Sequence, residues 1–175
     1  DDFGILFEED FEAYANFDQI SGDWTNYIEE GSRDWIARTT TDTGNPGSRI
    51  AQISAYNSGD ASTVSWLITP QIDLDAQEFE FFDFESSNSF SDGSELELLI
   101  STDWDGTDAS VSSATWTSLP GTIVPDATYY KDWIYSGLVD LSPYSGNAHI
   151  AFKYTANSGN TGTYEIDNVK VLVQN

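Results

Sequence analysis

The spacing of turn-forming residues constrains the fold of this chain more than any other feature of its sequence. Short alternating or aromatic runs are separated by clusters of Gly, Asn, Asp and Ser, and no stretch has a helical period of useful length. This pattern is typical of all-β proteins. It predicts strands at Ile5–Phe11, Trp24–Glu29, Asp34–Thr39, Arg49–Ser54, Thr63–Thr69, Glu78–Glu85, Glu95–Ser101, Thr115–Leu119, Lys131–Leu138, His149–Tyr154 and Thr163–Val173.

So many short strands in one domain, spanning residues 1–175, indicate a two-sheet antiparallel β-sandwich of the jelly-roll kind. The strand at Glu95–Ser101 illustrates the alternation, because Leu96, Leu98 and Ile100 alternate with Glu95 and Glu97. One face of this strand is therefore expected in the core and the other in water.

The charge of the chain limits its partners. Six Lys and Arg stand against 30 Asp and Glu, which gives a net charge of −24. Nucleic acid and anionic membrane surfaces are poor partners for such a protein. Neutral ligands and divalent cations are tolerated. No apolar run is long enough for membrane insertion, and cysteine is absent, so neither disulfides nor thiol chemistry is expected.

Carboxylates near both ends of the chain predict a metal ion. Asp167 lies within a strongly apolar strand, where a carboxylate is costly unless it is paired, hydrogen-bonded or metal-bound. Acidic residues also fill the segment Phe7–Glu12. Since cations are scarce, Ca²⁺ is the expected partner of these oxygen ligands, and it would hold the two ends together. The alternative is that Asp10 and Asp167 bond to local backbone groups.

A second acidic cluster, Asp103–Asp108, superficially resembles a calcium loop. An EF-hand loop requires a bidentate Glu at its twelfth position, which here is Ala114. We therefore interpret the segment as a turn rich in Asx and Gly, and whether it binds a second ion stays open.

The aromatic residues suggest a ligand surface. Trp35, Trp66 and Trp116 lie in strands with apolar neighbours and are assigned to packing. Other rings lie in or after polar loops and are expected to be more exposed. A sugar has an apolar C–H face and a polar rim, so it suits such rings, although they could instead close the ends of the sandwich. The predicted carbohydrate-binding residues are Trp104, Tyr129, Tyr130 and Trp133.

Catalysis is not expected. The single histidine, His149, lies at an outward position of its strand, and without a second His or a Cys no nucleophilic triad is supported. Paired acids could hydrolyse glycosides. However, the Glu-x-Asp-x-x-Glu arrangement of β-sandwich glycosidases is absent at Glu95 and incomplete at Asp83-Phe84-Glu85.

Six motifs in order resemble the choice-of-anchor J and cleaved-adhesin jelly-roll domains. They are Ile5–Glu12, Trp66–Leu74, Ser101–Gly106, Ala114–Thr117, Ile150–Tyr154 and Tyr164–Val171. The resemblance implies a secreted or surface-displayed module of Bacteroidota-type bacteria, built like MAM domains and calcium-containing carbohydrate-binding modules. It also implies a structural calcium held by Glu12, Asp167, the carbonyl of Asp10 and carbonyls within Pro46–Arg49.

The combined expectation is a non-catalytic module that binds a neutral polysaccharide, such as a β-glucan. It would be part of a larger secreted enzyme or surface glycan-binding protein. Met is absent even at position 1, so the chain is expected to be a fragment or a mature form. The alternative is an adhesion or protein-binding module without a sugar site, and a third interpretation is a structural spacer.

Overall fold

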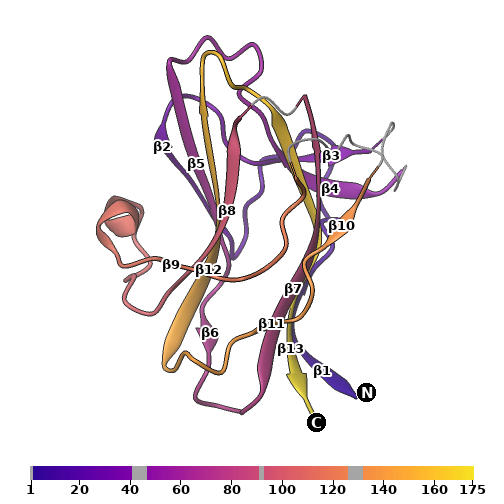
Figure 1. Ribbon diagram of the computed structural model, residues 1–175, viewed down its shortest axis with the longest axis vertical. Helices are drawn as coiled ribbons and strands as arrows, with labels where there is room; N and C mark the ends of the chain where they lie inside the picture. Colours follow the sequence, from indigo (N-terminus) through magenta and orange to yellow (C-terminus); the bar gives the residue numbers. More distant parts are fainter. Residues whose placement is uncertain (1, 41–46, 91–92, 126–131) are drawn as a thin grey trace.

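The computed structural model describes residues 2–40, 47–90, 93–125 and 132–175, and these form strands and one short 3-10 helix (Figure 1). The elements are β1 (Phe3–Glu9), β2 (Thr25–Glu30), β3 (Ile36–Thr39), β4 (Arg49–Ile53), β5 (Ser62–Ile68), β6 (Ile72–Asp73), β7 (Glu80–Ser89), β8 (Glu95–Ser101), η1 (Asp108–Ser113), β9 (Thr117–Ser118), β10 (Ile134–Tyr135), β11 (Val139–Asp140), β12 (Asn147–Asn157) and β13 (Thr163–Gln174).

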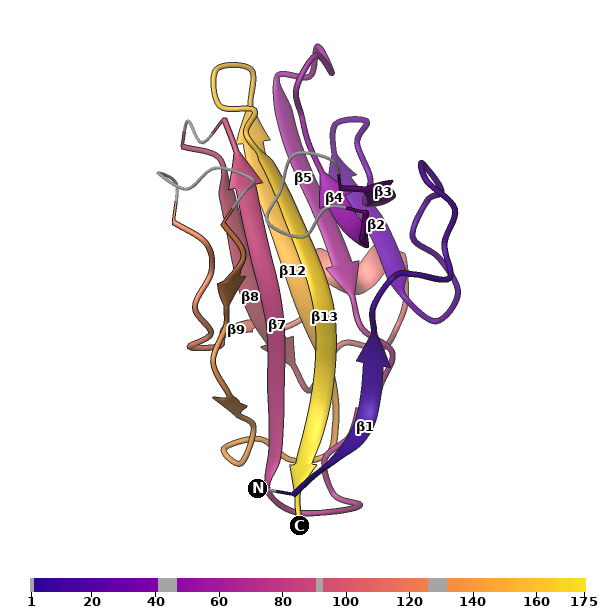
Figure 2. The ribbon, with the colours of Figure 1, turned by 90° about the vertical axis from the view of Figure 1, so that its right-hand side faces the viewer.

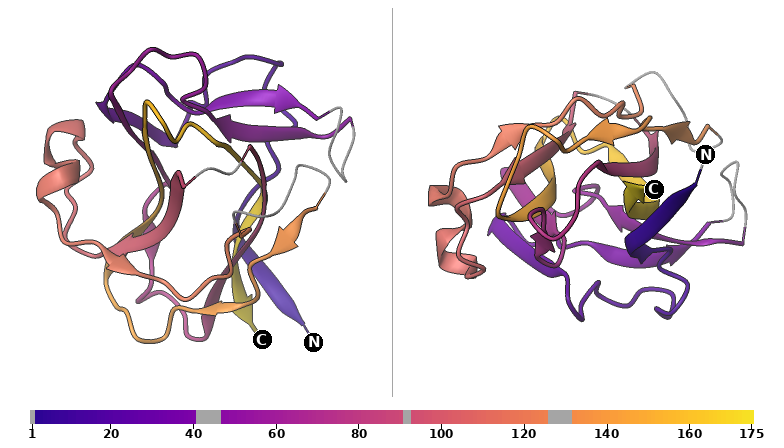
Figure 3. Two further views of the ribbon diagram at one scale, coloured as in Figure 1. Left: turned by 45° about the horizontal axis from the view of Figure 1, so that its top comes forward. Right: turned by 90° about the horizontal axis from the view of Figure 1, so that it is seen from below.

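The strands form two antiparallel sheets that pack against each other. Sheet A has the order β10–β7–β13–β4–β3, with β1 beside β13 and β11 beside β7. Sheet B has the order β2–β5–β12–β8–β9, with β6 beside β12. The two layers are apparent when the sandwich is seen along its length (Figure 3). The predicted all-β sandwich is confirmed.

The first and last strands pair with each other in sheet A. Phe3 lies opposite Gln174, and Glu9 lies opposite Val169. Both ends of the chain consequently lie side by side at one end of the sandwich (Figure 2). This confirms the expectation that the two terminal strands are neighbours.

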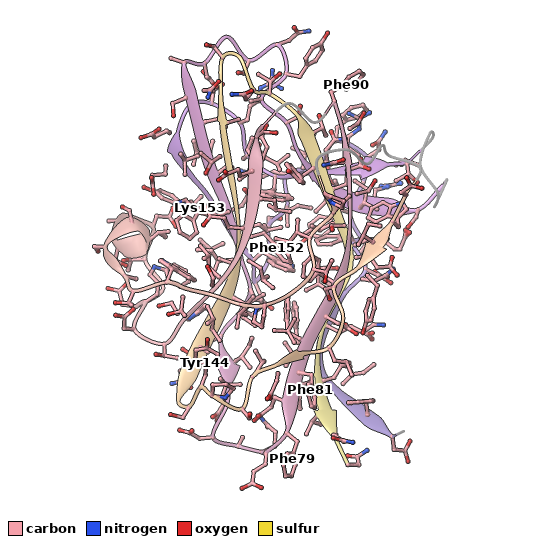
Figure 4. The ribbon with its side chains drawn as sticks, in the orientation of Figure 1. Phe79, Phe81, Phe90, Tyr144, Phe152 and Lys153 are labelled. Atoms are coloured by element: carbon pink, nitrogen blue, oxygen red, sulfur yellow. The ribbon has the colours of Figure 1, made fainter. Side chains whose placement is uncertain are left out.

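The core lies between the sheets and is rich in aromatic rings. On β12, Phe152 and Tyr154 are fully buried there. The Phe152 ring contacts Phe84 of sheet A edge-to-face, with 4.9 Å between ring centroids. The next residue, Lys153, points to the opposite side of β12 (Figure 4). This period of two gives sheet B a second face, on which the side chains are not part of the main core.

Close packing requires a glycine where the chain crosses from β9 to β10. A Cβ on Gly121 would lie 2.8 Å from Leu98 Cδ2 and 3.1 Å from Val139 Cγ2. The first distance is shorter than real Cβ contacts and the second is tight, so any larger residue would force the packed side chains of Leu98 and Val139 to shift.

Some elements were not expected from the sequence. β7 continues past Glu85 through Ser86-Ser87-Asn88-Ser89, four polar residues that are all buried. The short strands β6 and β11 and the helix η1 were also not predicted. Across the described residues, no helix has the length and apolar character needed to cross a membrane.

Candidate functional site

Glu12 and Asp167 meet at the hydroxyl group of Ser48, which directly precedes β4. Ser48 Oγ lies 3.3 Å from Glu12 Oε1 and 3.2 Å from Asp167 Oδ2. Glu12 also accepts hydrogen bonds from the Arg49 N–H, at 2.8 Å to Oε1 and 3.1 Å to Oε2. The two carboxylates predicted to be partners therefore share one corner of sheet A, called the acidic corner below.

A strained turn directs Glu12 into this corner. β1 ends at Glu9, whose carboxylate accepts hydrogen bonds from the Phe11 N–H and the Trp24 Nε1–H, both at 3.0 Å. Phe11 has φ 59°, which is unusual for a bulky residue, and its ring is completely buried. Burial of the ring compensates the backbone strain, and Glu12 follows on the surface side.

The carboxyl group of Asp167 is buried. Its side chain is only 1% exposed, and this burial raises the pKa of its carboxyl to about 7. Hydrogen bonds from the Asn168 N–H and Ser48 oppose the rise, while the charges of Glu85 and Glu12 add to it. A hard cation between Glu12 and Asp167 would stabilise both carboxylates in their charged form.

The acidic corner fits calcium only if backbone carbonyls or water complete the coordination. No group of three or more His, Cys, Asp or Glu side chains could hold a metal within the described ranges. The carboxylate of Asp10 accepts the Glu12 N–H at 3.0 Å, and a ligand role for the Asp10 carbonyl stays a prediction. Arg49 contacts Glu12 through its N–H. Pro46 lies outside the described residues.

A row of side chains crosses the outer face of sheet B. Tyr27, Trp66, Lys153 and Glu97 are register partners on β2, β5, β12 and β8. Lys153 Nζ lies 4.9 Å from the centroid of the Trp66 ring, and Trp66 Nε1 donates to Glu29 Oε1 at 3.3 Å. Neighbouring strands are about 4.8 Å apart, so the row spans roughly 14 Å.

Two more tryptophans from the connection between β8 and β9 cover part of this face. The Trp116 ring lies 5.1 Å from Trp66 and 6.1 Å from Trp104, measured between centroids. Their indole N–H groups donate to the backbone oxygens of Val111 and Thr107, at 2.8 and 2.9 Å respectively. These bonds fix the orientation of both rings before any ligand binds.

Trp104 is buried, which contradicts the prediction that it is exposed. Only 7% of it is accessible, and its ring contacts His149 edge-to-face at 4.6 Å. His149 does point outward from β12, but Trp104 covers it, and this burial lowers its pKa. A Gly/Asp turn suggested exposure, yet the turn folds back so that the indole packs on the sheet.

Carboxylates within the turn hold it in this position. Asp105 Oδ1 accepts hydrogen bonds from the N–H and Oγ–H of Thr107 and from Ser110 Oγ. The bonds from Ser110 and Thr107 lower the pKa of Asp105 to about 2. Asp103 accepts the Thr115 N–H at 2.8 Å. These contacts are the turn chemistry that the sequence predicts for Asp103–Asp108.

A pocket of about 410 Å³ opens on the outer face of sheet B, and it is called the sheet B pocket below. It combines two indole rings, an ammonium group, two carboxylates and hydroxyl groups in one concave surface. Such a set offers stacking surface, hydrogen-bond donors and hydrogen-bond acceptors to a ligand rich in hydroxyl groups. The lining residues are Glu29, Trp66, Glu97, Leu99, Ser112, Ala114, Trp116, Ser118 and Lys153.

The structure does not bring the predicted ligand-binding rings together. Trp104 lies on sheet B, whereas Trp133 immediately precedes β10 at the edge of sheet A. Tyr129 and Tyr130 lie outside the described residues. The ring cluster that does form, with Trp66 and Trp116, was assigned to packing by the sequence.

Trp66 is a packing residue as predicted, 3% exposed, but its cluster lies on the outer face of sheet B and not between the sheets. Trp66 alternates with Ser65 and Leu67 along β5. The residues on the same side of the strand as Trp66 are apolar, which suggests that this side faces the core. In the structure Leu67 belongs to the core between the sheets, whereas Trp66 belongs to the outer cluster. Trp35, by contrast, is fully buried in the core as predicted. The usable signal was Lys153, which cannot face the core and lies beside Trp66 in register.

Comparison with solved structures identifies the same fold in cleaved adhesin domains and in carbohydrate-binding modules. The K1 cleaved adhesin domain of Lys-gingipain from Porphyromonas gingivalis W83 is 15% identical, with a TM-score of 0.63 over 97% of this chain and 98% of that chain. The C-terminal family 22 carbohydrate-binding module of Clostridium thermocellum Xyn10B is 14% identical, with a TM-score of 0.55 over 97% and 94%.

A third similar structure, TmCBM61 in complex with β-1,4-galactotriose, is 13% identical, with a TM-score of 0.52 over 86% of this chain and 88% of that chain. No family model and no curated protein matches the chain. The likeness confirms a β-sandwich of the adhesin and carbohydrate-binding-module kind, and membership of the choice-of-anchor J family stays a prediction.

Proposed function

We propose that the protein is a non-catalytic carbohydrate-binding module that holds a neutral polysaccharide in the sheet B pocket. The observation that carries this proposal is the convergence of Trp116 and Trp66 with Lys153, Glu97 and Glu29 around one opening. Trp116 is half-buried and hydrogen-bonded in place, so it supplies a preorganised stacking surface for the C–H face of a sugar ring.

The charged groups of the pocket suit hydroxyl groups better than ions. Lys153 can donate hydrogen bonds, and Glu29 and Glu97 can accept them. Two carboxylates against one ammonium group, in a protein of net charge −24, disfavour an anionic sugar. Neutral xylan, β-1,4-galactan and β-glucan are the chains to test first, since solved modules of this fold are described as xylan-binding or are bound to β-1,4-galactotriose. The likeness to adhesin domains and carbohydrate-binding modules supports a secreted or outer-surface location within a larger protein.

The test is affinity electrophoresis and calorimetry with these three polysaccharides. Trp116→Ala should weaken binding by roughly 1–3 kcal/mol, about five- to 150-fold in Kd, because it removes the stacking ring. Glu97→Ala should weaken it less. Tyr56→Ala removes an exposed ring that does not line the pocket and serves as the matched control. Binding that survives Trp116→Ala and Glu97→Ala unchanged contradicts this site.

Salt gives a second criterion. A neutral ligand should bind with similar Kd at low and high ionic strength, whereas a charge-steered complex weakens as salt screens it. The reducing-end assay should stay at background for every polysaccharide on the panel.

A structural calcium at the acidic corner is a further part of the proposal. It would be held by Glu12, Asp167 and backbone carbonyls, including that of Asp10. Its support is the convergence of two carboxylates on Ser48 and the raised pKa of Asp167. Calcium would compensate the negative charge of the two carboxylates and would take no part in a reaction.

The alternative function is adhesion to a protein, and one observation favours it. Tyr56 and Phe90 are both exposed, and their rings stack with centroids 6.5 Å apart and an interplanar angle of 13°. Exposed aromatic pairs of this kind are common in protein interfaces. If no glycan binds and Tyr56→Ala abolishes binding to a protein partner, adhesion replaces carbohydrate binding.

A further inference from the structure

Glu97 on β8 and Lys153 on β12 lie directly opposite each other on the outer face of sheet B. Cross-strand partners of opposite charge stabilise a sheet when they pair, because their Cβ atoms are only about 5 Å apart. Here the ammonium group of Lys153 instead lies over the ring of Trp66 on β5, 4.9 Å from its centroid. β5 adjoins β12 on the side away from β8, so the lysine leans away from Glu97.

The carboxylate of Glu97 is left with both oxygens open. Within the described part of the chain, no hydrogen bond or ion pair reaches this carboxylate, although Glu97 is half-buried and lines the sheet B pocket. The second acid of the pocket differs, because Glu29 Oε1 accepts the Trp66 Nε1–H at 3.3 Å. Glu29 therefore holds Trp66 in place, and Glu97 is the carboxylate that is available to a ligand.

The surroundings of Glu97 favour a neutral ligand. Leu99, two residues further along β8, lines the pocket on the same side and is 6% exposed. The positive charge of Lys153 lies on the neighbouring strand and repels a metal ion or a guanidinium group that approaches Glu97. Among the described residues, no group of three or more His, Cys, Asp or Glu side chains could hold a metal. An uncharged donor of hydrogen bonds is the partner that this carboxylate suits.

The two oxygens of Glu97 suit a pair of donors. An ionised carboxylate only accepts hydrogen bonds, and its oxygens can accept two donors that lie side by side. Two hydroxyl groups on neighbouring carbon atoms of a sugar ring form such a pair. Lys153 can in turn donate to the oxygen of one of these hydroxyl groups. Bonds to a charged acceptor are stronger than bonds between neutral groups, so Glu97 should affect selection more than the serines of the pocket do.

The linkage of a polysaccharide decides whether it offers this pair of hydroxyl groups. Internal residues of β-1,4-linked xylan, galactan and glucan keep the hydroxyl groups on C2 and C3, and both are equatorial. In a β-1,3-linked glucan the oxygen on C3 belongs to the linkage, so the free hydroxyl groups on C2 and C4 are not neighbours. An acetyl group on O2 or O3 removes one donor of the pair.

We propose that Glu97 makes the sheet B pocket selective for β-1,4-linked polysaccharides whose hydroxyl groups on C2 and C3 are unsubstituted. This selectivity rests on the proposed function, since it belongs to the same pocket. The carboxylate of Glu97 accepts hydrogen bonds from both hydroxyl groups of one sugar residue, while Trp116 supplies the stacking surface. Chains linked through C3, and chains acetylated at O2 or O3, bind weakly because they cannot donate both bonds.

The first experiment compares ligands by calorimetry. Xylan, β-1,4-galactan, β-1,4-linked gluco-oligosaccharides and a soluble β-1,3-glucan are titrated into the wild-type protein. The tightest ligand is then partly O-acetylated, and a sample of the product is deacetylated again with mild alkali. The acetylated chain and the β-1,3-glucan should each bind at least about tenfold more weakly than the unsubstituted β-1,4-linked chain, because a donor of the pair is missing. Deacetylation should restore the affinity.

The second experiment tests the residue itself. Glu97→Gln keeps the shape of the side chain and replaces one acceptor oxygen by a donor. Binding of the unsubstituted chain should weaken about fivefold, and the ratio between the Kd values of acetylated and unsubstituted chains should fall. Glu95→Gln is the matched control, because Glu95 lies on the same face of β8, is exposed and does not line the pocket. It should change neither the affinity nor the ratio, and melting curves check that both variants fold.

The outcomes distinguish the selectivity from the pocket itself. If Trp116→Ala weakens binding while Glu97→Gln behaves like Glu95→Gln, the pocket stands and Glu97 does not select the ligand. A β-1,3-glucan or an acetylated chain that binds as tightly as the unsubstituted β-1,4-linked chain also overturns the selectivity. If Trp116→Ala leaves binding unchanged, or if no polysaccharide binds, the pocket and the selectivity both fall. If Glu97→Gln does not fold, the comparison of ligands with the wild-type protein decides.

Discussion

Replacing Asp167 by Asn should make the metal-free protein more stable at neutral and alkaline pH. Burial raises the pKa of this carboxyl from its ordinary value of 3.8 to about 7, so the folded protein holds the proton more tightly than the unfolded chain. Stability therefore falls as pH rises from about 4 to about 7, and the full loss is present above pH 7. The difference between the two pKa values corresponds to at most roughly 4 kcal/mol. The amide of Asn keeps an acceptor for the Asn168 N–H and removes the charge.

The assay is thermal unfolding of wild type and Asp167→Asn from pH 4 to pH 8, in EDTA and in calcium. In EDTA the two proteins should melt alike at pH 4, and the variant should melt higher at pH 8, by up to roughly 10 °C. In calcium at 100 times its Kd, the wild type should gain about 2.7 kcal/mol and the variant nothing. Glu165→Gln is the matched control, because burial raises the pKa of Glu165 to about 7 too, but it lies outside the acidic corner. That variant should keep the calcium response.

Two results would refute this reasoning separately. Equal melting temperatures of wild type and Asp167→Asn at every pH in EDTA would show that the buried charge carries no penalty. A wild-type melting temperature that calcium leaves unchanged, with no metal by elemental analysis, would remove the calcium proposal.

Two further changes test the core. Tyr154→Phe should cost about 1–3 kcal/mol in urea unfolding, because the hydroxyl donates to the Gly162 oxygen at 2.6 Å and accepts the Ala55 N–H at 3.2 Å, and both backbone groups would lose a partner. Gly121→Ala should cost about 1–3 kcal/mol, since its Cβ would overlap the core. Gly159→Ala, where a Cβ has only an ordinary contact at 3.6 Å, should change stability by less than about 0.5 kcal/mol. Equal effects of the two glycine changes would contradict the packing argument.

Strand alternation carried most of the fold prediction, because it is a local property. Leu96, Leu98 and Ile100 face the core as their alternation with glutamates predicts. Strand alternation failed to predict a strand where the buried residues are polar. The Ser86–Ser89 end of β7 is polar and buried, and no sequence rule based on hydrophobicity extends a strand through it.

The candidate site was predictable only in part. The acidic residues of the two terminal strands suggested that these strands lie together, whereas the meeting of Glu12 with Asp167 was implied only by the resemblance to calcium-containing jelly rolls. The sheet B pocket could not be predicted, because both faces of β5 are buried and alternation alone does not say which face is inside. Trp104 shows the same limit, since a loop residue becomes buried only once the loop folds back on a sheet formed by distant strands.

The pairing of β1 with β13 also determines how the domain would respond to mechanical tension. Residues 2 and 175 lie together at one end of an antiparallel ladder, so a force that separates them opens the ladder like a zipper, one residue pair after another, beginning at Phe3 and Gln174. Bonds broken in sequence resist far less force than bonds sheared together. The opening would travel to Glu9 and Val169 and then reach the acidic corner. An ion bound there would hold Glu12 and Asp167 together and stop the separation of β1 from β13. Calcium would then set the force at which the rest of the sandwich begins to unfold.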